Sequence, residues 1–403
     1  MNYIKKKILK SFKYRIYPNK SQEILINKTL GCARFIYNKM LEERIEFYQN
    51  NKDNKEILYN HKYKTEKEYK SEFEWLKEVD AVALVQSRMN LETAFKNFFS
   101  SLKKKTGRKY GYPKFKSKKN NRNKYSTQEC RNNIRVDFEK HLIKLPKLGF
   151  VKYRDNRLFS GIIKSATVEK TPTNKYFVSI LVESENEISI HQVSEKSKVI
   201  GLDYDSKNLF TDNQGNTSGY PKFYRKYEKL LTREQKKLSK KIYKSKNYEK
   251  QRIKVAKIHE KIVNSRKDFQ QKLSTDIVRN YDIIGVENLN MLGIVRSLNL
   301  AKSTLDNSWS SFVNMLEYKA EWHGKHLIFA DKHYASSKMC NVCGYKNVEL
   351  KLSDREWVCP ICHTEHNRDI NAAINLMHNA IDNVSSTVGT TGIQAHGDLT
   401  SGS

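Results

Sequence analysis

The sequence predicts an α+β fold built from several domains, and three observations lead to this prediction. Short runs of alternating apolar and polar residues fill positions 125 to 192, as in a small β-barrel or sheet. Residues 21 to 105 carry helical periodicity and interrupt this β domain after a first strand in residues 1 to 20. From residue 195 onward, short apolar strands alternate with long helices. The 403 residues are enough for two or three domains.

The composition indicates a polyanionic partner. The chain has 75 Lys and Arg residues against 44 Asp and Glu residues, which gives a formal net charge of +31. Such a chain repels itself unless a polyanion neutralises it, and nucleic acid is the default partner because its phosphates bind Lys and Arg. No run of about 18 apolar residues occurs, and no apolar signal region follows the basic N-terminus. We therefore expect nucleic-acid binding and no membrane partner.

The predicted elements of the first half begin with a strand. Phe12, Tyr14 and Ile16 alternate with basic residues, and Pro18 with Asn19 ends the run. Ser21 is the predicted cap of a helix over residues 21 to 50. A second helix covers residues 79 to 102, while residues 51 to 70 read as a loop or an exposed helix end. Strands are then predicted at 133–136, 141–145, 164–170 and 176–184.

A basic run occupies residues 103 to 124. Long runs of charge are usually solvated surface, but this run is interleaved with Tyr110, Tyr112 and Phe115. Lys and Arg bind phosphates, and aromatic rings stack on bases. The pattern therefore favours contact with nucleic acid.

The second half alternates strands and helices after a linker at residues 194 to 198. The apolar run 199–202 predicts a buried strand that ends at Asp203, and a second strand follows before the turn at 213–216. Two basic amphipathic helices fill residues 222 to 280, and the strand 283–286 ends at Glu287. The remaining predictions are a loop over 293–307, a helix over 309–320, a strand over 326–331, and a helix that begins at Asp369.

Three acids at element ends indicate a metal site. Asp203 and Glu287 each follow a buried strand, and Asp369 opens a helix. Carboxylates that meet in a buried place repel one another and lose hydration unless a cation lies among them. Hard oxygen ligands suit Mg²⁺ or Mn²⁺, and two such ions about 4 Å apart can activate water and stabilise a leaving oxygen. The order of the acids along the chain is typical of an RNase H-like nuclease fold. The alternative is that each acid is an ordinary cap or turn residue.

The cysteines predict a second metal site. Six cysteines in a chain of this size do not make a disulfide scaffold, so we expect a reduced, intracellular protein. Cys32 and Cys130 are isolated, whereas the other four form two Cys-x-x-Cys pairs separated by fifteen residues: Cys340, Cys343, Cys359 and Cys362. Four thiolates make a closed, structural Zn²⁺ site. His363 and His366 are near enough to compete as ligands, but four thiolates already fill the shell.

Several motifs together resemble one family. The segments are SFKYRIYPNKSQ, LGCARFIYN, NLETAFKNFF and KLPKLGFVK in the first half, and GLDYDSKNLF, GVENLN, CNVC, CPIC and NRDINAAINL in the second. They resemble TnpB, the RNA-guided DNA endonuclease of insertion sequences, which is similar to the ancestors of type V CRISPR effectors. The resemblance spans nearly the whole chain.

The resemblance implies a domain arrangement. A wedge-type β-barrel would comprise residues 1–20 and 106–194, with a helical recognition domain inserted at 21–105. A RuvC nuclease domain would comprise 195–337 and 366–384, with a zinc ribbon inserted at 338–365. Residues 385–403 would form a disordered tail.

The resemblance also implies a mechanism and a set of site residues. The catalytic triad falls on Asp203, Glu287 and Asp369 with Mg²⁺ or Mn²⁺, and the zinc ligands fall on the four paired cysteines. A guide RNA from the transposon end would pair with one strand of a target double-stranded DNA. The protein, one monomer per guide RNA, would read a short flanking motif near Gln86 and Thr127. The expected location is the prokaryotic cytoplasm, on the nucleoid when DNA is bound. Asp205 is an extra acid that could assist a metal or merely be solvated, and we expect the second.

Three other functions remain open at this point. A compact type V CRISPR effector would use the same chemistry with a separate array of guides. A guided repressor would bind DNA without cleaving it, and the complete set of acids argues against this. A DNA-joining transposase is disfavoured because the sequence has no plausible tyrosine nucleophile and no separate DDE pattern.

Overall fold

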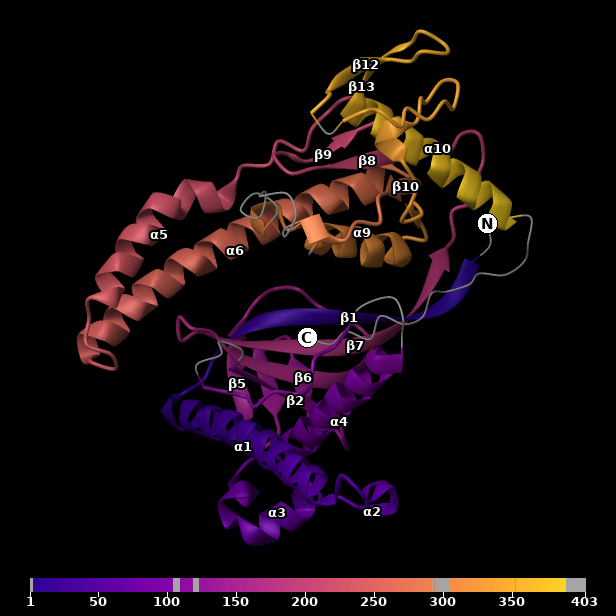
Figure 1. The fold of residues 1–403 in the computed structure, drawn as a ribbon. Helices are drawn as coiled ribbons and strands as arrows, with labels where there is room; N and C mark the ends of the chain where they lie inside the picture. Colours follow the sequence, from indigo (N-terminus) through magenta and orange to yellow (C-terminus); the bar gives the residue numbers. More distant parts are fainter. Residues whose placement is uncertain are drawn as a thin grey trace. The chain divides into compact units, whose positions relative to one another are not determined.

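The computed structural model describes residues 3–103, 109–118, 123–291, 293–294, 305–351 and 353–388. It divides into two compact units (Figure 1). The N-terminal unit is Lys7–Asn186, and the C-terminal unit is Glu187–Ser403 together with Met1–Lys6. Within the described ranges, no helix is both long enough and apolar enough to cross a membrane.

A seven-stranded sheet forms the body of the N-terminal unit, with the strand order β2-β6-β7-β1-β5-β4-β3. The first strand lies between β7 and β5, which confirms that the N-terminal strand completes the predicted β domain. Alternate residues of these strands, such as Tyr14, Val151 and Val178, form one apolar core. The strands are β1(Tyr3–Tyr17), β2(Asn123–Gln128), β3(Arg135–Asp137), β4(Leu142–Leu145), β5(Gly149–Arg154), β6(Ile162–Lys170) and β7(Tyr176–Ser189).

Two long helices, α1(Lys20–Asn51) and α4(Ala81–Lys103), pack against this sheet (Figure 1). Ile26 of the first helix and Ala83 of the second belong to the same core as the strands. The prediction of Ser21 as the cap was wrong, because Asn19 caps α1. The Asn19 side chain accepts from Gln22 N at 2.9 Å, and the Gln22 side chain accepts from Asn19 N at 3.0 Å.

The stretch predicted as a loop or exposed helix end contains two short helices. They are α2(Lys55–Asn60) and α3(Glu66–Glu72), and a 3₁₀ turn at Glu74–Glu78 follows. Tyr69 from this stretch and Leu76 from the 3₁₀ turn are almost fully buried against α1 and α4. The sequence did not predict these helices, because the segment is mostly polar and only a few apolar side chains pack it against the neighbouring helices.

The C-terminal unit contains a four-stranded sheet with the order β11-β10-β8-β9. β10 is parallel to both β8 and β11, whereas β9 is antiparallel to β8. The predicted strands of this half are confirmed. Their bounds are β8(Val199–Asp205), β9(Leu209–Asp212), β10(Ile283–Val286) and β11(His326–Phe329).

Helices cover both faces of this sheet. Apolar residues of β8 and β10, such as Ile200 and Val286, pack with α6(Lys246–Asn280) and α9(Trp309–Trp322) on one face. On the other face lies α10(Arg368–Val388), which packs against β8 and β10 (Figure 1). α5(Phe223–Ser239) and α6 form the predicted pair of basic helices, which pack on each other.

Two predicted segments without regular structure overlap helical residues. The tail was expected to begin at residue 385, but α10 continues to Val388 because Val384 packs under the sheet with Ile283. Residues 389–403 lie outside the described residues. The loop expected over 293–307 falls mostly on residues 295–304, which also lie outside them, and residues 305–307 are helical.

Candidate catalytic site and metal centre

Two glycines let α10 approach the sheet more closely than any side chain would permit. A Cβ added to Gly201 of β8 would lie 1.9 Å from Ala373 O and 2.7 Å from Met377 N. A Cβ added to Gly285 of β10 would lie 2.3 Å from Leu376 O. The helix backbone therefore rests directly on the two strands.

The same register brings two of the predicted acids side by side. Gly285 pairs with Gly201 and Val286 pairs with Leu202, so Glu287 follows next to Asp203, just past the last pair of the β8–β10 ladder. Each acid stands two residues after its glycine, and residues two apart on a strand face the same side. That side is covered by α10, whose first turn carries Asp369. The topology thus directs all three predicted acids to the same face of the sheet, where the charges of Glu287 and Asp369 act on Asp203.

The acids share one electrostatic environment. Burial, followed by the charges of Glu287 and Asp369, raises the pKa of Asp203 well above its usual range, while Arg368 opposes this rise. Burial also raises the pKa of Glu287, and a hydrogen bond from Ser336 opposes it. These shifts arise because ionised carboxylates are costly to bury together. Mg²⁺ or Mn²⁺ suits this donor set, since hard oxygen ligands favour a hard cation.

Asp369 is held by two arginines. Arg355 Nη1 donates to both of its carboxylate oxygens, at 3.0 and 2.8 Å. Arg368 donates through Nε and Nη2 at 3.3 and 3.2 Å. The two guanidinium groups thus fix the orientation of the Asp369 carboxylate, and a metal ion would compete with them for its oxygen atoms. Among the described residues, the ligand atoms of the four paired cysteines lie close enough together to hold one metal ion, whereas those of the three acids are not gathered that closely.

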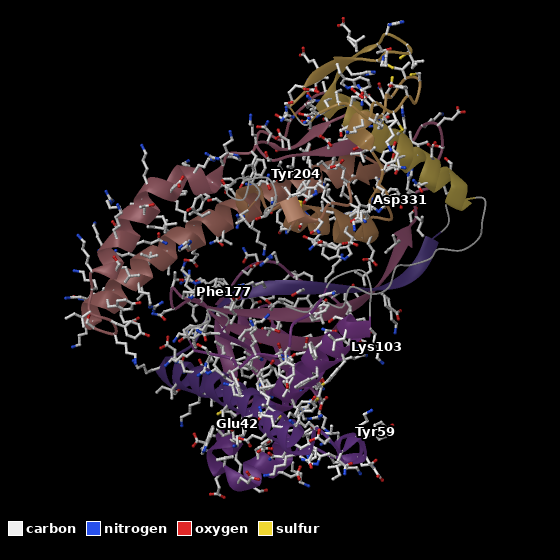
Figure 2. The ribbon with its side chains drawn as sticks, in the orientation of Figure 1. Glu42, Tyr59, Lys103, Phe177, Tyr204 and Asp331 are labelled. Atoms are coloured by element: carbon white, nitrogen blue, oxygen red, sulfur yellow. The ribbon has the colours of Figure 1, made fainter. Side chains whose placement is uncertain are left out.

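Asp205 has a separate, structural role. Its Oδ1 accepts from Lys207 N at 2.7 Å, and its Oδ2 accepts from Asn208 Nδ2 at 2.8 Å. These bonds cap the turn between β8 and β9. Asp205 is partly buried in this turn, next to Tyr204, which Figure 2 labels. Both carboxylate oxygens are thus engaged by the turn, so Asp205 is not simply solvated, as was expected.

The four paired cysteines form the metal-binding group predicted from their spacing. Their sulfur atoms all lie within 4.8 Å of one another. Cys340 Sγ is 3.5 Å from Cys362 Sγ, and Cys343 Sγ is 3.6 Å from Cys359 Sγ. A zinc ion bound at about 2.3 Å by four thiolates sets tetrahedral sulfur–sulfur edges of about 3.8 Å, so this arrangement fits Zn²⁺.

The two cysteine pairs sit in equivalent turns. Gly344 N donates to Cys340 O at 3.0 Å, and His363 N donates to Cys359 O at 2.9 Å. Gly344 and His363 both adopt a positive φ, of 76° and 57°. His363 is therefore the counterpart of a turn glycine and is exposed. His366 is buried instead, with Nε2 at 3.1 Å from Cys340 Sγ. The ribbon consists of the two Cys-x-x-Cys turns and a small two-stranded sheet. Its strands are β12(Glu356–Val358) and β13(Glu365–Asn367).

The two predicted DNA-contact residues lie near each other in the N-terminal unit. Gln86 of α4 accepts a hydrogen bond of 3.4 Å from Gln128, the last residue of β2. Thr127 of β2 is only 1% exposed, and its hydroxyl has no hydrogen-bond partner among the described residues. Gln86 is therefore better placed than Thr127 to contact a ligand.

Part of the basic run is anchored on α1. Asn38 binds the backbone of Lys116 twice, with Nδ2 donating to the carbonyl at 2.9 Å and Oδ1 accepting from the amide at 2.7 Å. Lys116 Nζ lies 3.8 Å from the centre of the Tyr37 ring. Tyr112 and Phe115 are 43% and 53% exposed. Residues 104–108 and 119–122 of this run lie outside the described residues.

Several residues of the site escaped the sequence analysis. Ser336, Arg355 and Arg368 contact the acids, yet none belongs to a pattern of periodicity or charge. A signal for the strands did exist, because a glycine stands two residues before Asp203 and again before Glu287. A shared glycine at that spacing indicates that another backbone approaches both strands.

Three family models match separate parts of the chain. The Cas12f1-like TNB domain matches residues 309–376, and the probable transposase model of the OrfB/IS605 type matches residues 179–298. A helix-turn-helix domain of the same OrfB/IS605 type matches residues 7–53. The last of these covers most of β1 and all of α1.

Named relatives point the same way. A Streptomyces pristinaespiralis protein, named as an inferred RNA-guided DNA endonuclease, is 32% identical over 371 residues, covering 92% of this chain and 89% of the relative. InsQ of Escherichia coli K12, named likewise, is 30% identical over 388 residues, with 92% of both chains covered. The mimivirus TnpB-like protein L79 is 29% identical over 127 residues, 30% of this chain and 24% of its own length.

A solved structure shares the fold. The Cas12f1 chain in a complex with sgRNA and target DNA superposes with a TM-score of 0.56 at 13% identity, covering 92% of this chain and 99% of that chain. The α+β fold of this chain is thus similar to that of Cas12f1. Given the long alignments with named relatives, the chain belongs to the TnpB family of the IS605 type.

Proposed function

We propose that this protein is an RNA-guided endonuclease of an insertion sequence, which cleaves double-stranded DNA next to a short flanking motif in a RuvC-type, RNase H-like site. The observation that supports the proposal most directly is the meeting of three acids. Asp203 and Glu287 leave neighbouring parallel strands on the face covered by α10, and Asp369 lies in the first turn of that helix. Membership of the TnpB family adds the guided mode of action.

The acids would hold Mg²⁺ or Mn²⁺, which would supply Lewis-acid activation of water and stabilisation of the leaving oxygen. Asp203 is 8% exposed, so its carboxylate is shielded from bulk water. Shielding strengthens its attraction for a cation and for any positive group nearby. Arg355 and Arg368 fix the orientation of Asp369 before substrate arrives. The arginine side chains can also meet the phosphate of a bound strand once a cation competes for the carboxylate.

The ribbon would serve as a structural zinc site. Four cysteine thiolates would close the zinc shell, so the ribbon takes no part in hydrolysis. It carries Arg355 just before β12, and Arg368 N donates to Arg355 O at 2.8 Å. The folded ribbon therefore places a cation beside Asp369. Loss of zinc would unfold the ribbon and would therefore also free Arg355 from its position beside Asp369.

The guide RNA is the proposed source of sequence specificity, with the protein supplying basic surface. The formal net charge of +31 fits a protein that neutralises many phosphates. α5 and α6 contribute a strongly basic helical pair, and Lys116 with Tyr112 and Phe115 contributes a basic and aromatic surface in the N-terminal unit. Gln86 remains the proposed contact to the flanking motif, with Thr127 beside it.

A pair of neighbouring acids provides a sharp test of the catalytic assignment. Asp203→Asn should lower guided DNA cleavage by more than about a hundredfold, the upper range for losing a residue that merely supports a metal ligand. Asp205→Asn is the matched control, because the amide oxygen can still accept from Lys207 N at the turn. Its cleavage rate should stay near that of the wild type. Undiminished cleavage by Asp203→Asn would refute the assignment.

The guided mode is tested by sequencing RNA that co-purifies with the protein. A discrete structured RNA that ends in a variable segment is expected. DNA cleavage that proceeds equally well after this RNA is removed would refute guidance. Specific DNA binding without any nick in the presence of Mg²⁺ would show a guided binding protein instead.

A further inference from the structure

A short connection between β11 and the ribbon is tied to α10. We call residues Tyr334 to Asn341 the strap. Asn375 Nδ2 donates to Ser336 O at 2.8 Å and to Met339 O at 2.6 Å. Asn371 Nδ2 donates to the same Met339 carbonyl at 2.7 Å, and Asn371 Oδ1 accepts from Asn341 N at 3.0 Å. The strap is therefore held by two side chains of one helix.

The two asparagines are well suited to fix the strap. They stand four residues apart, so they share one face of α10. Both are nearly inaccessible, with Asn371 2% and Asn375 3% exposed. A buried amide group that loses its hydrogen bonds pays the cost of desolvation, so the bonds to the strap are hard to exchange. Tyr334 OH adds a further bond to Asn375 O at 3.1 Å.

The strap in turn holds an acid of the proposed site. Ser336 is 2% exposed, and its Oγ donates to Glu287 Oε1 at 2.7 Å. The hydroxyl engages one carboxylate oxygen and leaves the other for a cation. Glu287 follows the last residue of β10 and belongs to no strand or helix. A rigid donor is therefore the feature that can fix its side chain.

We propose that Ser336 is a positioning residue for Glu287, so that α10 determines the positions of two acids, Asp369 and Glu287. The helix α10 carries Asp369 in its first turn. It also positions Glu287, because Asn375 of α10 binds the Ser336 carbonyl and the Ser336 hydroxyl binds Glu287. This inference rests on the proposed function, because it assumes that Asp203, Glu287 and Asp369 bind the divalent ion. Its content is separate, since it assigns the geometry of the site to a chain of buried hydrogen bonds.

Direct binding of Mn²⁺ tests the inference without depending on cleavage. Free Mn²⁺ is measured by electron paramagnetic resonance during titration of full-length, zinc-loaded protein freed of nucleic acid. Ser336→Ala should weaken binding at the acid site by about tenfold, the lower range for loss of a group that supports a metal ligand. Ser337→Ala is the matched control, because Ser337 is the next residue of the same turn and should bind as the wild type does. Ser336→Thr keeps the hydroxyl and should restore most of the affinity.

A second variant tests the chain of bonds. Asn375→Ala should also weaken Mn²⁺ binding, and the double variant with Ser336→Ala should lose less than the sum of the two, because both act on Glu287. Additive losses would overturn the proposed link. The zinc content of each variant is measured alongside, and a cleavage defect of Ser336→Ala that saturating Mn²⁺ does not reduce would overturn the positioning role.

The two proposals fail in different ways. If Asp203→Asn binds Mn²⁺ as tightly as the wild type, the acid site itself is refuted and the positioning role falls with it. If Asp203→Asn loses binding while Ser336→Ala retains the affinity of the wild type, the proposed function stands and Ser336 has no positioning role.

Discussion

Replacing Gly201 by alanine should disrupt the contact between α10 and the sheet. The added Cβ would lie 1.9 Å from Ala373 O, against an ordinary contact of 3.4 Å or more, so the helix would have to retreat by about 1.5 Å. The neighbouring atoms are helix backbone and cannot swing aside. Overpacking of this kind costs typically 1–3 kcal/mol, and a backbone clash places Gly201→Ala at about 3 kcal/mol. In a unit of about 200 residues, this corresponds to a melting temperature lower by about 6–12 °C.

The same displacement should also impair cleavage. Asp369 lies one helical turn from Ala373, and a misplacement of about 1 Å in a reacting group can cost about a hundredfold in rate. Thermal unfolding and guided cleavage at a temperature where the variant is folded are the two measurements. Gly31→Ala is the control, because a Cβ there meets nothing within 4 Å. Gly31 lies inside α1, where alanine should stabilise by about 0.5–1 kcal/mol. Gly201→Ala with the stability and rate of the wild type would refute the close-approach argument.

Other predictions concern the acids, the ribbon and a buried lysine. Because the pKa of Asp203 is raised in the folded state, the contribution of this carboxyl to stability without metal should be fully present below its ordinary pKa and be lost as pH rises through the folded-state pKa. Asp203→Asn should remove part of that loss, as melting in EDTA across pH would show. Cys340→Ser should release zinc, which metal analysis would detect, and an unchanged zinc content would contradict the site. His363→Gly should raise the melting temperature slightly, because glycine adopts a φ of 57° without the cost of about 1 kcal/mol. Lys319→Ala should lower the free energy of unfolding by about 2–3 kcal/mol in urea, because the Lys319 ammonium donates to Gln271 O, Ser274 Oγ and Thr275 Oγ1 across α6 and α9.

The local sequence was sufficient for many features of the fold. The apolar runs before Asp203 and Glu287 correctly predicted β8 and β10. A strand that is buried on both faces requires an uninterrupted apolar run. The cysteine spacing predicted a group whose sulfur atoms lie within 4.8 Å of one another. Helix ends were less accessible to sequence reasoning. The cap of α1 fell on Asn19, because the Asn19 and Gln22 side chains form reciprocal bonds that Ser21 cannot make.

The sequence by itself determined which residues can carry the chemistry, namely three acids at element ends, four paired cysteines and a strong excess of positive charge. The tertiary structure decided how they are held. Asp205 resembles Asp203 in sequence, yet it caps a turn, whereas Ser336 and Arg355 contact acids far away in the chain. The physical reason is that charge type and periodicity are local properties. The burial of a carboxylate, and the partners that remain available to it, depend instead on backbones brought together from distant segments, as at Gly201 and α10.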